Sequence, residues 1–278
     1  MDKRNRGRGQ APRHVKPQGL DVGGDAHIAP PDLDEGVIIG RNAVIEALEA
    51  ALTIDKIYIA KGEVDNTLGH IASRARDTGS VVVETDRRKL DAMARGRAHQ
   101  GIVAQAAVKA YVELEDILEI AKERGEAPLV VLCDELSDPH NLGAVIRTAE
   151  AAGAHGIVIP KRRSAGMTQI VQKTSAGAVS HLPVARVPNM VAAIKTLQEA
   201  GLWIYGAAMK GEQTLWETDL TGPLAFVIGS EGGGLGRLVA EHCDFQIRIP
   251  MVGKVGSLNA SVSAALLVYE AIRQRTGG

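Results

Sequence analysis

The stretch "IRIPMVGKVGSLNASVSAAL", residues 247–266, begins as an apolar strand and ends as an apolar helix. A polar string that contains Ser257 and Asn259 lies where the two patterns meet. An unpaired polar group in an apolar neighbourhood costs about 1–3 kcal/mol, so these side chains need partners. Ser257 is predicted to cap the helix, and Asn259 offers a donor and an acceptor near its first turn. We interpret the junction as one wall of a ligand site, with Ile249 and Leu258 as apolar neighbours.

The same alternation of apolar strands and helices runs through the chain from about residue 128. Near-continuous apolar strands that alternate with helices are typical of a parallel sheet covered on both faces. Ligands of such sheets bind beyond the carboxyl ends of the strands. The predicted strands are "LVVLCDE", "GIVIP", "PVARV", "LWIYGAA", "LAFVIG" and "FQIRIP", and the predicted helices span 141–152, 168–180, 189–200 and 257–274.

A second polar cluster is "LSDPHNLGAVIRTA", residues 136–149, which follows the first of these strands. An Asp-Pro turn opens it, and Asn141 is predicted to cap the helix that follows. Gly143 and Arg147 are four residues apart and therefore share a helix face. The bare Cα at position 143 admits either a ligand or a second backbone, and Arg147 adds a permanently charged fork beside it.

A third polar cluster is "VIGSEGGGLGRL", residues 227–238, at the end of another strand. Its glycines resemble a phosphate-binding loop, but Arg237 stands where the last Gly of G-x-G-x-x-G belongs, and the G-K-[ST] of a P-loop is missing. The pattern therefore does not support a nucleoside triphosphate site. It favours backbone donors and acceptors exposed to a ligand, with Glu231 as the nearby acid.

The first part of the chain has a different organisation. Among its first sixteen residues six basic side chains face only Asp2, which predicts a flexible basic arm over 1–35, either a solvated tail or a polyanion-binding segment. The strands "IDKIYIA", "SVVVET" and "GIVAQAA" alternate with helical stretches and predict a small α/β domain over 36–107. The helix "ELEDILEIAKERG" suits a connector over 108–127, which leaves the parallel sheet to residues 128–278.

Composition excludes several classes of protein. The 278 residues are 45% hydrophobic with a formal net charge of -1, as in an ordinary globular protein of about two domains. No apolar run approaches twenty residues, so we expect no membrane span. Cys133 and Cys243 are far apart and in apolar segments, which favours buried thiols in a reducing cytoplasm and no metal site.

Three motifs, in this order and spacing, carry a resemblance to a known family. They are "NLGAVIRTA" (141–149), "GSEGGGL" (229–235) and "IPMVGKVGSLNASVSAAL" (249–266), and they resemble those of the SpoU, or TrmH, family of RNA ribose 2'-O-methyltransferases. The front segments "IIGRNAVIEAL" and "AHQGIVAQ" also resemble the ribosomal-protein-like (L30e-like) substrate-binding domain of that family. The similarity runs from about Gly36 to Arg275.

The resemblance implies a catalytic domain with a deep trefoil knot, a bound S-adenosylmethionine and a homodimer that completes the site across its interface. Periodicity does not predict a knot, because knots are rare exceptions to the rules of chain connection. By motif, the catalytic residues correspond to Asn141, Arg147, Glu231, Ser257 and Asn259, and the cofactor-binding residues to Gly229, Ser230, Gly232, Ile249, Met251, Leu258 and Asn259.

The methyl transfer that the resemblance implies needs a base for the ribose hydroxyl proton. A free guanidinium stays protonated in proteins and is a poor base. Two hypotheses follow: Arg147 is held in an unusual state or works with a substrate phosphate, or Arg147 is an electrostatic clamp while Glu231 or water accepts the proton.

The motifs look most like those of the bacterial enzyme that methylates a guanosine of 23S ribosomal RNA. A tRNA-directed methyltransferase and a non-catalytic RNA-binding assembly factor are the alternatives. The basic run Lys161–Arg163 is a candidate for phosphate contacts or a solvated charge run.

Overall fold

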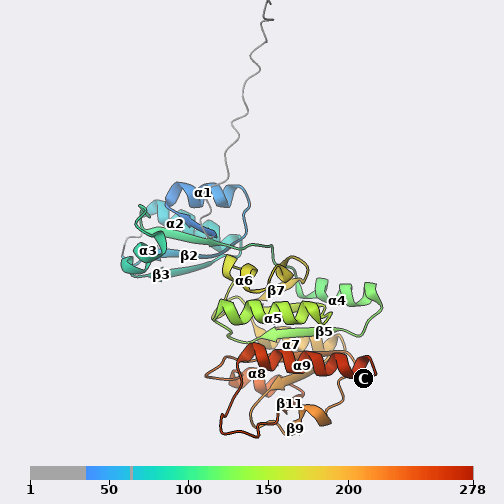
Figure 1. The fold of residues 1–278 in the computed structure, drawn as a ribbon. Helices are drawn as coiled ribbons and strands as arrows, with labels where there is room; N and C mark the ends of the chain where they lie inside the picture. The colour runs from blue at the N-terminus through green and yellow to red at the C-terminus, as the bar shows by residue number, and fades with distance from the viewer. Residues whose placement is uncertain (1–35, 63–64, 278) are drawn as a thin grey trace, which may run out of the picture. The chain divides into compact units, whose positions relative to one another are not determined.

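The structure is a computed structural model that describes residues 36–62 and 65–277 (Figure 1). The predicted basic arm, residues 1–35, lies outside the described residues. The predicted division of the rest of the chain at residues 107 and 127 stays a prediction.

A four-stranded mixed sheet forms in the first part of the described chain, in the order β1-β4-β2-β3. β2 is parallel to β3 and antiparallel to β4, which is also antiparallel to β1. The three strands predicted here are confirmed, whereas the short edge strand β1 was not predicted because three residues show no period. The strands are β1 (Val37–Ile39), β2 (Ile54–Ala60), β3 (Val81–Thr85) and β4 (Ile102–Ala106).

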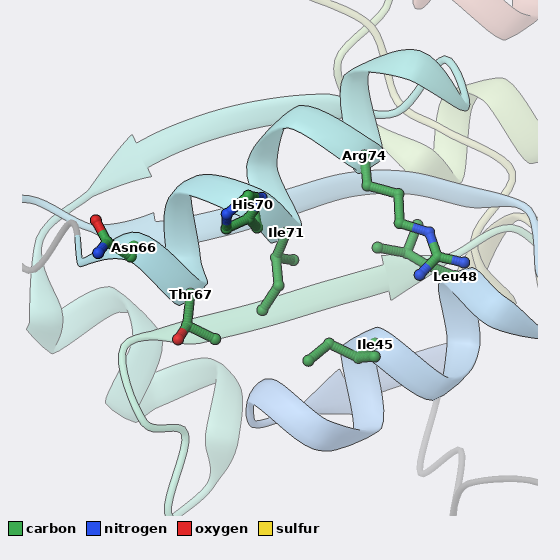
Figure 2. A pocket seen from close by; sticks show the side chains of 7 residues that line it. All are labelled: Ile45, Leu48, Asn66, Thr67, His70, Ile71 and Arg74. Carbon is green, nitrogen blue, oxygen red and sulfur yellow. The ribbon is translucent and has the colours of Figure 1, made fainter.

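Helices cover both faces of this small sheet. α1 (Arg41–Glu49) and α2 (Asn66–Asp77) bury their apolar side chains, including Val44 and Leu68, against one face. α3 (Arg87–Ala94) packs Leu90 and Ala94 against the other face. A cavity of about 290 Å³ lies between α1 and α2, where Figure 2 shows Ile45 and Ile71 facing each other.

The larger sheet has seven strands in the order β7-β6-β5-β10-β8-β11-β9, and every pairing is parallel. The central strands β5 and β10 are buried along their whole length, which is why their sequences are apolar runs without alternation. The predicted parallel sheet is confirmed, and the knot that the family resemblance implies stays a prediction. The strands are β5 (Leu129–Cys133), β6 (Gly156–Pro160), β7 (Val184–Val187), β8 (Trp203–Ala207), β9 (Gln213–Thr214), β10 (Leu224–Ile228) and β11 (Phe245–Arg248).

Two hydrophobic layers cover this sheet. One contains buried side chains of α5 and α9, and the other contains those of α4 and α7. The helix predicted over 168–180 is divided, because Ala176 (φ 50°) and Gly177 (φ 88°) adopt left-handed backbone conformations that a helix cannot contain. The helices are α4 (Leu114–Arg124), α5 (Pro139–Ala151), α6 (Gln169–Thr174), α7 (Met190–Glu199), α8 (Arg237–His242) and α9 (Ala260–Arg275), with short 3-10 helices at Ala178–Ser180 and Leu215–Glu217.

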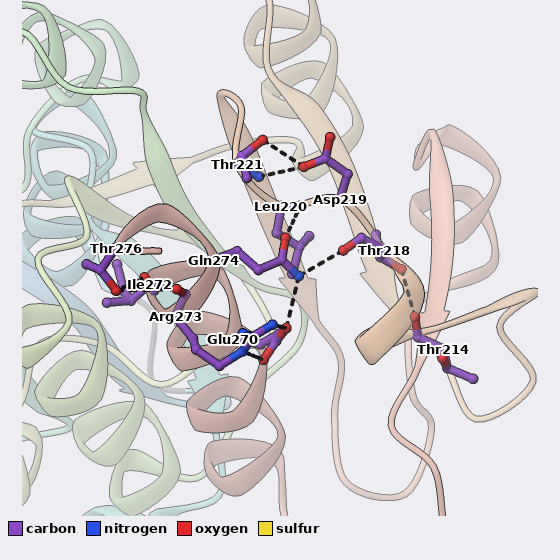
Figure 3. A network of polar contacts seen from close by, with 10 residues as sticks. All are labelled: Thr214, Thr218, Asp219, Leu220, Thr221, Glu270, Ile272, Arg273, Gln274 and Thr276. Carbon is purple, nitrogen blue, oxygen red and sulfur yellow. Dashed lines mark hydrogen bonds and ion pairs between the residues drawn. The ribbon is translucent and has the colours of Figure 1, made fainter. Parts of the chain in front are cut away.

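Polar contacts attach the end of α9 to the segment that precedes β10 (Figure 3). The Gln274 amide accepts a hydrogen bond from the Leu220 N–H at 2.8 Å and donates to the Thr218 carbonyl at 3.0 Å. The same amide donates to Glu270, which also pairs with Arg273 at 2.8 Å. These bonds hold the last helix in register with the sheet.

A buried ion pair connects the two sheets. Asp55 of β2 is 1% exposed and pairs with Arg186 of β7 at 2.9 Å. The Tyr111 hydroxyl donates to the same carboxylate oxygen, and the guanidinium lies 4.2 Å from the centre of the Tyr111 ring. Burial raises the pKa of Asp55, although Tyr111 and Arg186 act in the opposite direction. No local pattern in the sequence predicts this pair, because its members are 131 residues apart.

Candidate active site

Three side chains from the three predicted clusters meet beyond the carboxyl ends of the strands. The Asn141 amide donates to Glu231 Oε1 at 3.0 Å. The Asn259 amide donates to Asn141 Oδ1 at 2.9 Å and also to Glu231 Oε1. Segments separated by about half the chain thus form one connected polar group, which we call the Asn-Glu-Asn cluster.

Asn259 joins this cluster while capping α9. Its Oδ1 accepts hydrogen bonds from the N–H groups of Ser261 and Val262 at 2.8 and 3.3 Å. Its Nδ2 remains free to donate to Asn141 and Glu231. The prediction that Ser257 caps this helix is wrong: Ser257 is exposed in the irregular segment before it. The cap therefore fixes the rotamer of a candidate catalytic side chain.

Asn141 has a similar position at the start of α5, but it is not the cap that the sequence predicted. Asp138 is the N-cap and accepts a hydrogen bond from the His140 N–H at 2.9 Å, and Pro139 follows at the first helical position. Asn141 lies within the first turn and is 6% exposed. Because Asp138 caps the helix, the Asn141 side chain is available to Glu231.

Gly143 makes room for a second backbone rather than for a ligand. A Cβ at this position would lie 2.7 Å from the Thr174 Cβ and 3.0 Å from the Val171 carbonyl oxygen of α6. Arg147 lies one turn further along α5 and is exposed. Among the described residues it makes no hydrogen bond or ion pair, so the structure does not join it to the Asn-Glu-Asn cluster.

The glycine-rich segment forms a tight turn that carries Glu231. Ser230 and Gly234 exchange backbone hydrogen bonds at 3.1 and 2.9 Å. The Gly234 backbone passes so close to Gly229 that a Cβ there would overlap it. Glu231 and Gly232 are exposed in the turn.

Asp134 binds the C-terminal end of the same glycine-rich segment, and the sequence motifs did not identify it as a functional residue. Its carboxylate accepts a hydrogen bond from the Gly236 N–H at 2.9 Å, and burial raises the pKa of this acid. Its position could have indicated a role, because an acidic residue directly follows the buried strand β5. We assign Asp134 to positioning of the turn.

The segment between β11 and α9 is open to a ligand. Within the described part of the chain, the backbone of residues 249–258 makes no hydrogen bond with other backbone groups. Ile249 and Leu258 are half-buried, whereas Met251 is exposed and Val252 is 99% exposed. Free peptide groups beside apolar side chains suit a ligand with a flat apolar body and polar edges.

The residues that the structure places contain neither a candidate metal site nor a candidate membrane-spanning helix. None of the groups of His, Cys, Asp and Glu there could hold a metal ion. No helix in that part is long and apolar enough to cross a membrane. Cys133 and Cys243 are free, and burial raises the pKa of each thiol to about 12.

Comparisons with known proteins cover both sheets. The model of the SpoU rRNA Methylase family matches residues 128–269, and a model described as RNA 2'-O ribose methyltransferase substrate binding matches residues 37–112. A protein of Bacillus subtilis (strain 168), whose name places it in the TrmH family of tRNA/rRNA methyltransferases, is 48% identical over 238 residues, which are 86% of this chain and 95% of the relative.

Solved structures are similar as well. The SpoU methyltransferase AviRb from Streptomyces viridochromogenes, in complex with the cofactor AdoMet, matches 87% of this chain and 91% of its own, with 26% identity and a TM-score of 0.55. An AdoMet-bound rRNA methyltransferase from Sinorhizobium meliloti matches 86% and 87% of the two chains, with the same identity and TM-score. With a family model over residues 128–269 and a relative 48% identical over most of its length, this chain belongs to the SpoU rRNA methylase family.

Proposed function

We propose that this protein transfers the methyl group of S-adenosylmethionine to a ribose 2'-hydroxyl of RNA, and that the nucleotide is a guanosine of 23S ribosomal RNA. The observation that carries the proposal is the Asn-Glu-Asn cluster, which fixes a carboxylate beyond the carboxyl ends of a parallel sheet. The rRNA target rests on the family model and on the motifs quoted above. The same resemblance supports a cytoplasmic enzyme.

The residues present fit the cofactor. The free peptide groups of residues 249–258 can hydrogen-bond the edge of a purine, and Ile249 and Leu258 can pack on its faces. Gly229, Ser230 and Gly232 bring backbone to the same end of the sheet, and Met251 adds a further apolar side chain. When bound, S-adenosylmethionine supplies an electrophilic methyl group on a sulfonium.

In the reaction a bond forms between the ribose oxygen and the methyl carbon while the carbon–sulfur bond breaks, and its electron pair stays on sulfur. The hydroxyl proton leaves to a base. We assign that role to Glu231, because two amide donors hold Oε1 and the other carboxylate oxygen accepts no hydrogen bond from the described residues. Holding reactants in line can supply several kcal/mol, up to about 7–11 in ideal cases.

Arg147 in this scheme is an electrostatic clamp. Its permanent charge and planar donors suit a phosphate beside the reacting ribose. Its exposure on α5 and the absence of an acidic partner among the described residues leave it available to RNA. We also assign Ser257 to a substrate contact, because its side chain is exposed next to Leu258.

A homodimer is part of the proposal. Large apolar side chains are exposed beside the site at Val252 (99%) and Val255 (68%), and along α9 at Val262 and Tyr269. Exposed apolar groups gathered in one region mark interaction sites. A second copy that covers them would also exclude water from the site.

The test is methyl transfer from isotopically labelled S-adenosylmethionine to fragments of 23S ribosomal RNA and to tRNA transcripts. Alkaline hydrolysis then locates the product, because a methylated 2'-oxygen cannot attack the neighbouring phosphate and the chain stays intact there. Transfer to tRNA alone would replace the rRNA target. Cofactor binding without transfer to either RNA would overturn the enzymatic proposal in favour of a binding factor.

A further inference from the structure

A basic surface lies on α3, on the side of the small sheet opposite to α1 and α2. Residues 87–97 contain five cationic side chains and one carboxylate, that of Asp91. Leu90 and Ala94 are buried against the sheet, and the Lys89 ammonium lies 5.0 Å from the centre of the Tyr58 ring of β2. Arg88 and Lys89 are exposed. We call this set the α3 basic surface; its cations are Arg87, Arg88, Lys89, Arg95 and Arg97.

Asp86, exposed at the N-cap of α3, is a neighbouring carboxylate, and Asp91 within the surface holds the turn that follows the helix. The ring of His99, which is 4% exposed, lies 3.0 Å from Asp91 through Nε2. The other ring nitrogen, Nδ1, accepts a hydrogen bond from the Gly101 N–H at 3.0 Å. Asp91 therefore orders the turn as well as offsetting one charge.

The turn is held in a conformation that ordinary residues avoid. Arg95 and Gln100 have φ values of 50° and 52°, in the left-handed region that favours glycine. Arg41 donates to the Gln100 side chain through its N–H at 3.1 Å and to the Gln100 carbonyl through Nε at 3.0 Å. Non-glycine residues persist in this region when the surroundings over-determine them, a feature that gathers at functional sites.

We propose that the α3 basic surface binds the phosphate backbone of the substrate RNA. The inference rests on the proposed function and adds the surface by which the small domain holds the RNA. Clustered cations on one face provide sequence-independent attraction to phosphate, and a pre-ordered turn loses little freedom on binding. Aromatic residues are 3% of the chain, so contacts to the backbone rather than base stacking carry this attraction.

On the opposite face of the same sheet, the arginines of α2 have acidic residues beside them. Arg74 of α2 pairs with Glu49 of α1 at 3.2 Å, beside the cavity shown in Figure 2. Arg76, also on α2, is exposed and is followed by Asp77. This face offers a control with the same number of removable charges in the same domain.

The test compares R88Q/K89Q with R74Q/R76Q by fluorescence anisotropy. The probe is a labelled fragment of 23S ribosomal RNA that the wild type binds, titrated at several salt concentrations. Loss of two phosphate contacts should lower the slope of log K against log salt by about 1.4–1.8, and should weaken binding by roughly tenfold or more at 0.1 M salt. The R74Q/R76Q variant should keep the wild-type slope.

Two outcomes overturn the proposal: an unchanged slope in R88Q/K89Q, or an equal loss in both variants, which would mean diffuse attraction. Thermal unfolding and S-adenosylmethionine binding, both expected at wild-type values in R88Q/K89Q, exclude a folding defect. If R88Q/K89Q has a lower unfolding temperature than the wild type, R97Q is compared with R76Q instead. The proposal then requires that R97Q lower the slope of log K against log salt and that R76Q leave it unchanged. The anisotropy assay measures RNA binding and does not require methyl transfer. If the wild type fails to methylate RNA, the proposed function is contradicted, but the comparison of RNA binding between the variants still tests the α3 basic surface.

Discussion

Asn259 caps a helix and is also a member of the Asn-Glu-Asn cluster, to which we assign the chemistry. Its oxygen caps α9 and its nitrogen donates to Asn141 and Glu231. The helix fixes the direction of the oxygen, and the geometry of a planar amide then fixes the direction of the nitrogen. The two roles can be separated by substitution.

Asn259→Asp should keep the cap of α9, because a carboxylate also caps a helix, and should therefore lose less stability than Asn259→Ala. It should abolish most methyl transfer, because the donor to Glu231 is lost and a second negative charge takes its place. Asn259→Ala should lose both, with about 0.5–2 kcal/mol removed from the free energy of unfolding. Urea unfolding and methyl transfer on the same preparations measure the two effects. Equal stability losses in both variants would contradict the separation.

Glu231→Gln tests the assignment of the base. The amide keeps the shape of the side chain and accepts the same hydrogen bonds but does not take the proton, so the transfer rate should fall by about 10²–10⁴. The acidic limb of the pH–rate profile should disappear with it. Arg147→Lys should lower the rate while keeping that limb, because the clamp and the base are different groups. An unchanged acidic limb in Glu231→Gln would remove Glu231 as the base.

The sequence predicted that three polar clusters lie at one edge of the sheet, but not which of their side chains hydrogen-bond to one another. Asn141, Glu231 and Asn259 were identified because each follows an apolar strand, and parallel strands end at a common edge. Their hydrogen bonds span 90, 118 and 28 residues, and no local pattern predicts which groups pair across such distances. The caps were misassigned for a related reason: Ser257, Asn259, Asp138 and Asn141 all suit a cap, and only the path of the backbone chooses between them.

Among the secondary-structure elements, long apolar runs were predicted correctly and short exposed ones were missed. β6 (Gly156–Pro160) and β2 (Ile54–Ala60) have the predicted bounds. β9 (Gln213–Thr214) and α8 (Arg237–His242) are too short to show a period and too polar to show a run. Such elements form because longer neighbours position them.

The contact between α5 and α6 depends on the missing side chain of Gly143. Gly143→Ala should reduce the free energy of unfolding by about 1–3 kcal/mol, because the new Cβ would lie 2.7 Å from the Thr174 Cβ and the two backbones must separate. Gly232→Ala is the matched control, since no atom lies within 4 Å of a Cβ there. Chemical denaturation of the two variants measures the difference, and equal stability would refute this account of the packing.

β5 and β6 are joined at their starting ends through His155, which is 1% exposed. Its Nδ1 accepts a hydrogen bond from the Leu129 N–H at 3.0 Å, and its Nε2 lies 3.0 Å from Glu126 Oε2. Burial lowers the pKa of the ring, although Glu126 acts in the opposite direction. The folded state thus disfavours the protonated ring. The associated stability is complete above the unfolded pKa near 6.5 and is lost as pH falls below it.

The wild type should therefore lose stability between pH 7.5 and 5.5, and His155→Gln should show a smaller loss over the same window. Urea unfolding at a series of pH values gives each slope. A His155→Gln slope equal to that of the wild type would show that another group causes the dependence.

At the scale of the whole molecule, polar contacts among the described residues join the two sheets, and the buried pair of Asp55 and Arg186 is one of them. The Lys56 ammonium adds a hydrogen bond to the Ser164 carbonyl at 3.0 Å, and Arg186 also donates to the Gly79 carbonyl at 3.2 Å. One oxygen of Asp55, Oδ2, is buried without a hydrogen-bond partner among the described residues. A carboxylate in this position depends on its cation.

Arg186→Ala should cost about 3–5 kcal/mol, because it leaves the Asp55 charge buried and unpaired. Asp55→Ala removes that charge, and the remaining guanidinium keeps Tyr111 and the Gly79 carbonyl. The double variant should therefore be more stable than the sum of the single losses predicts, by an interaction energy of about 0.5–3 kcal/mol. Equilibrium unfolding of the wild type, the two single variants and the double variant gives the free energies for this double-mutant cycle. Strict additivity would mean that Asp55 and Arg186 are in contact without energetic coupling, and that the connection between the two sheets does not depend on this ion pair.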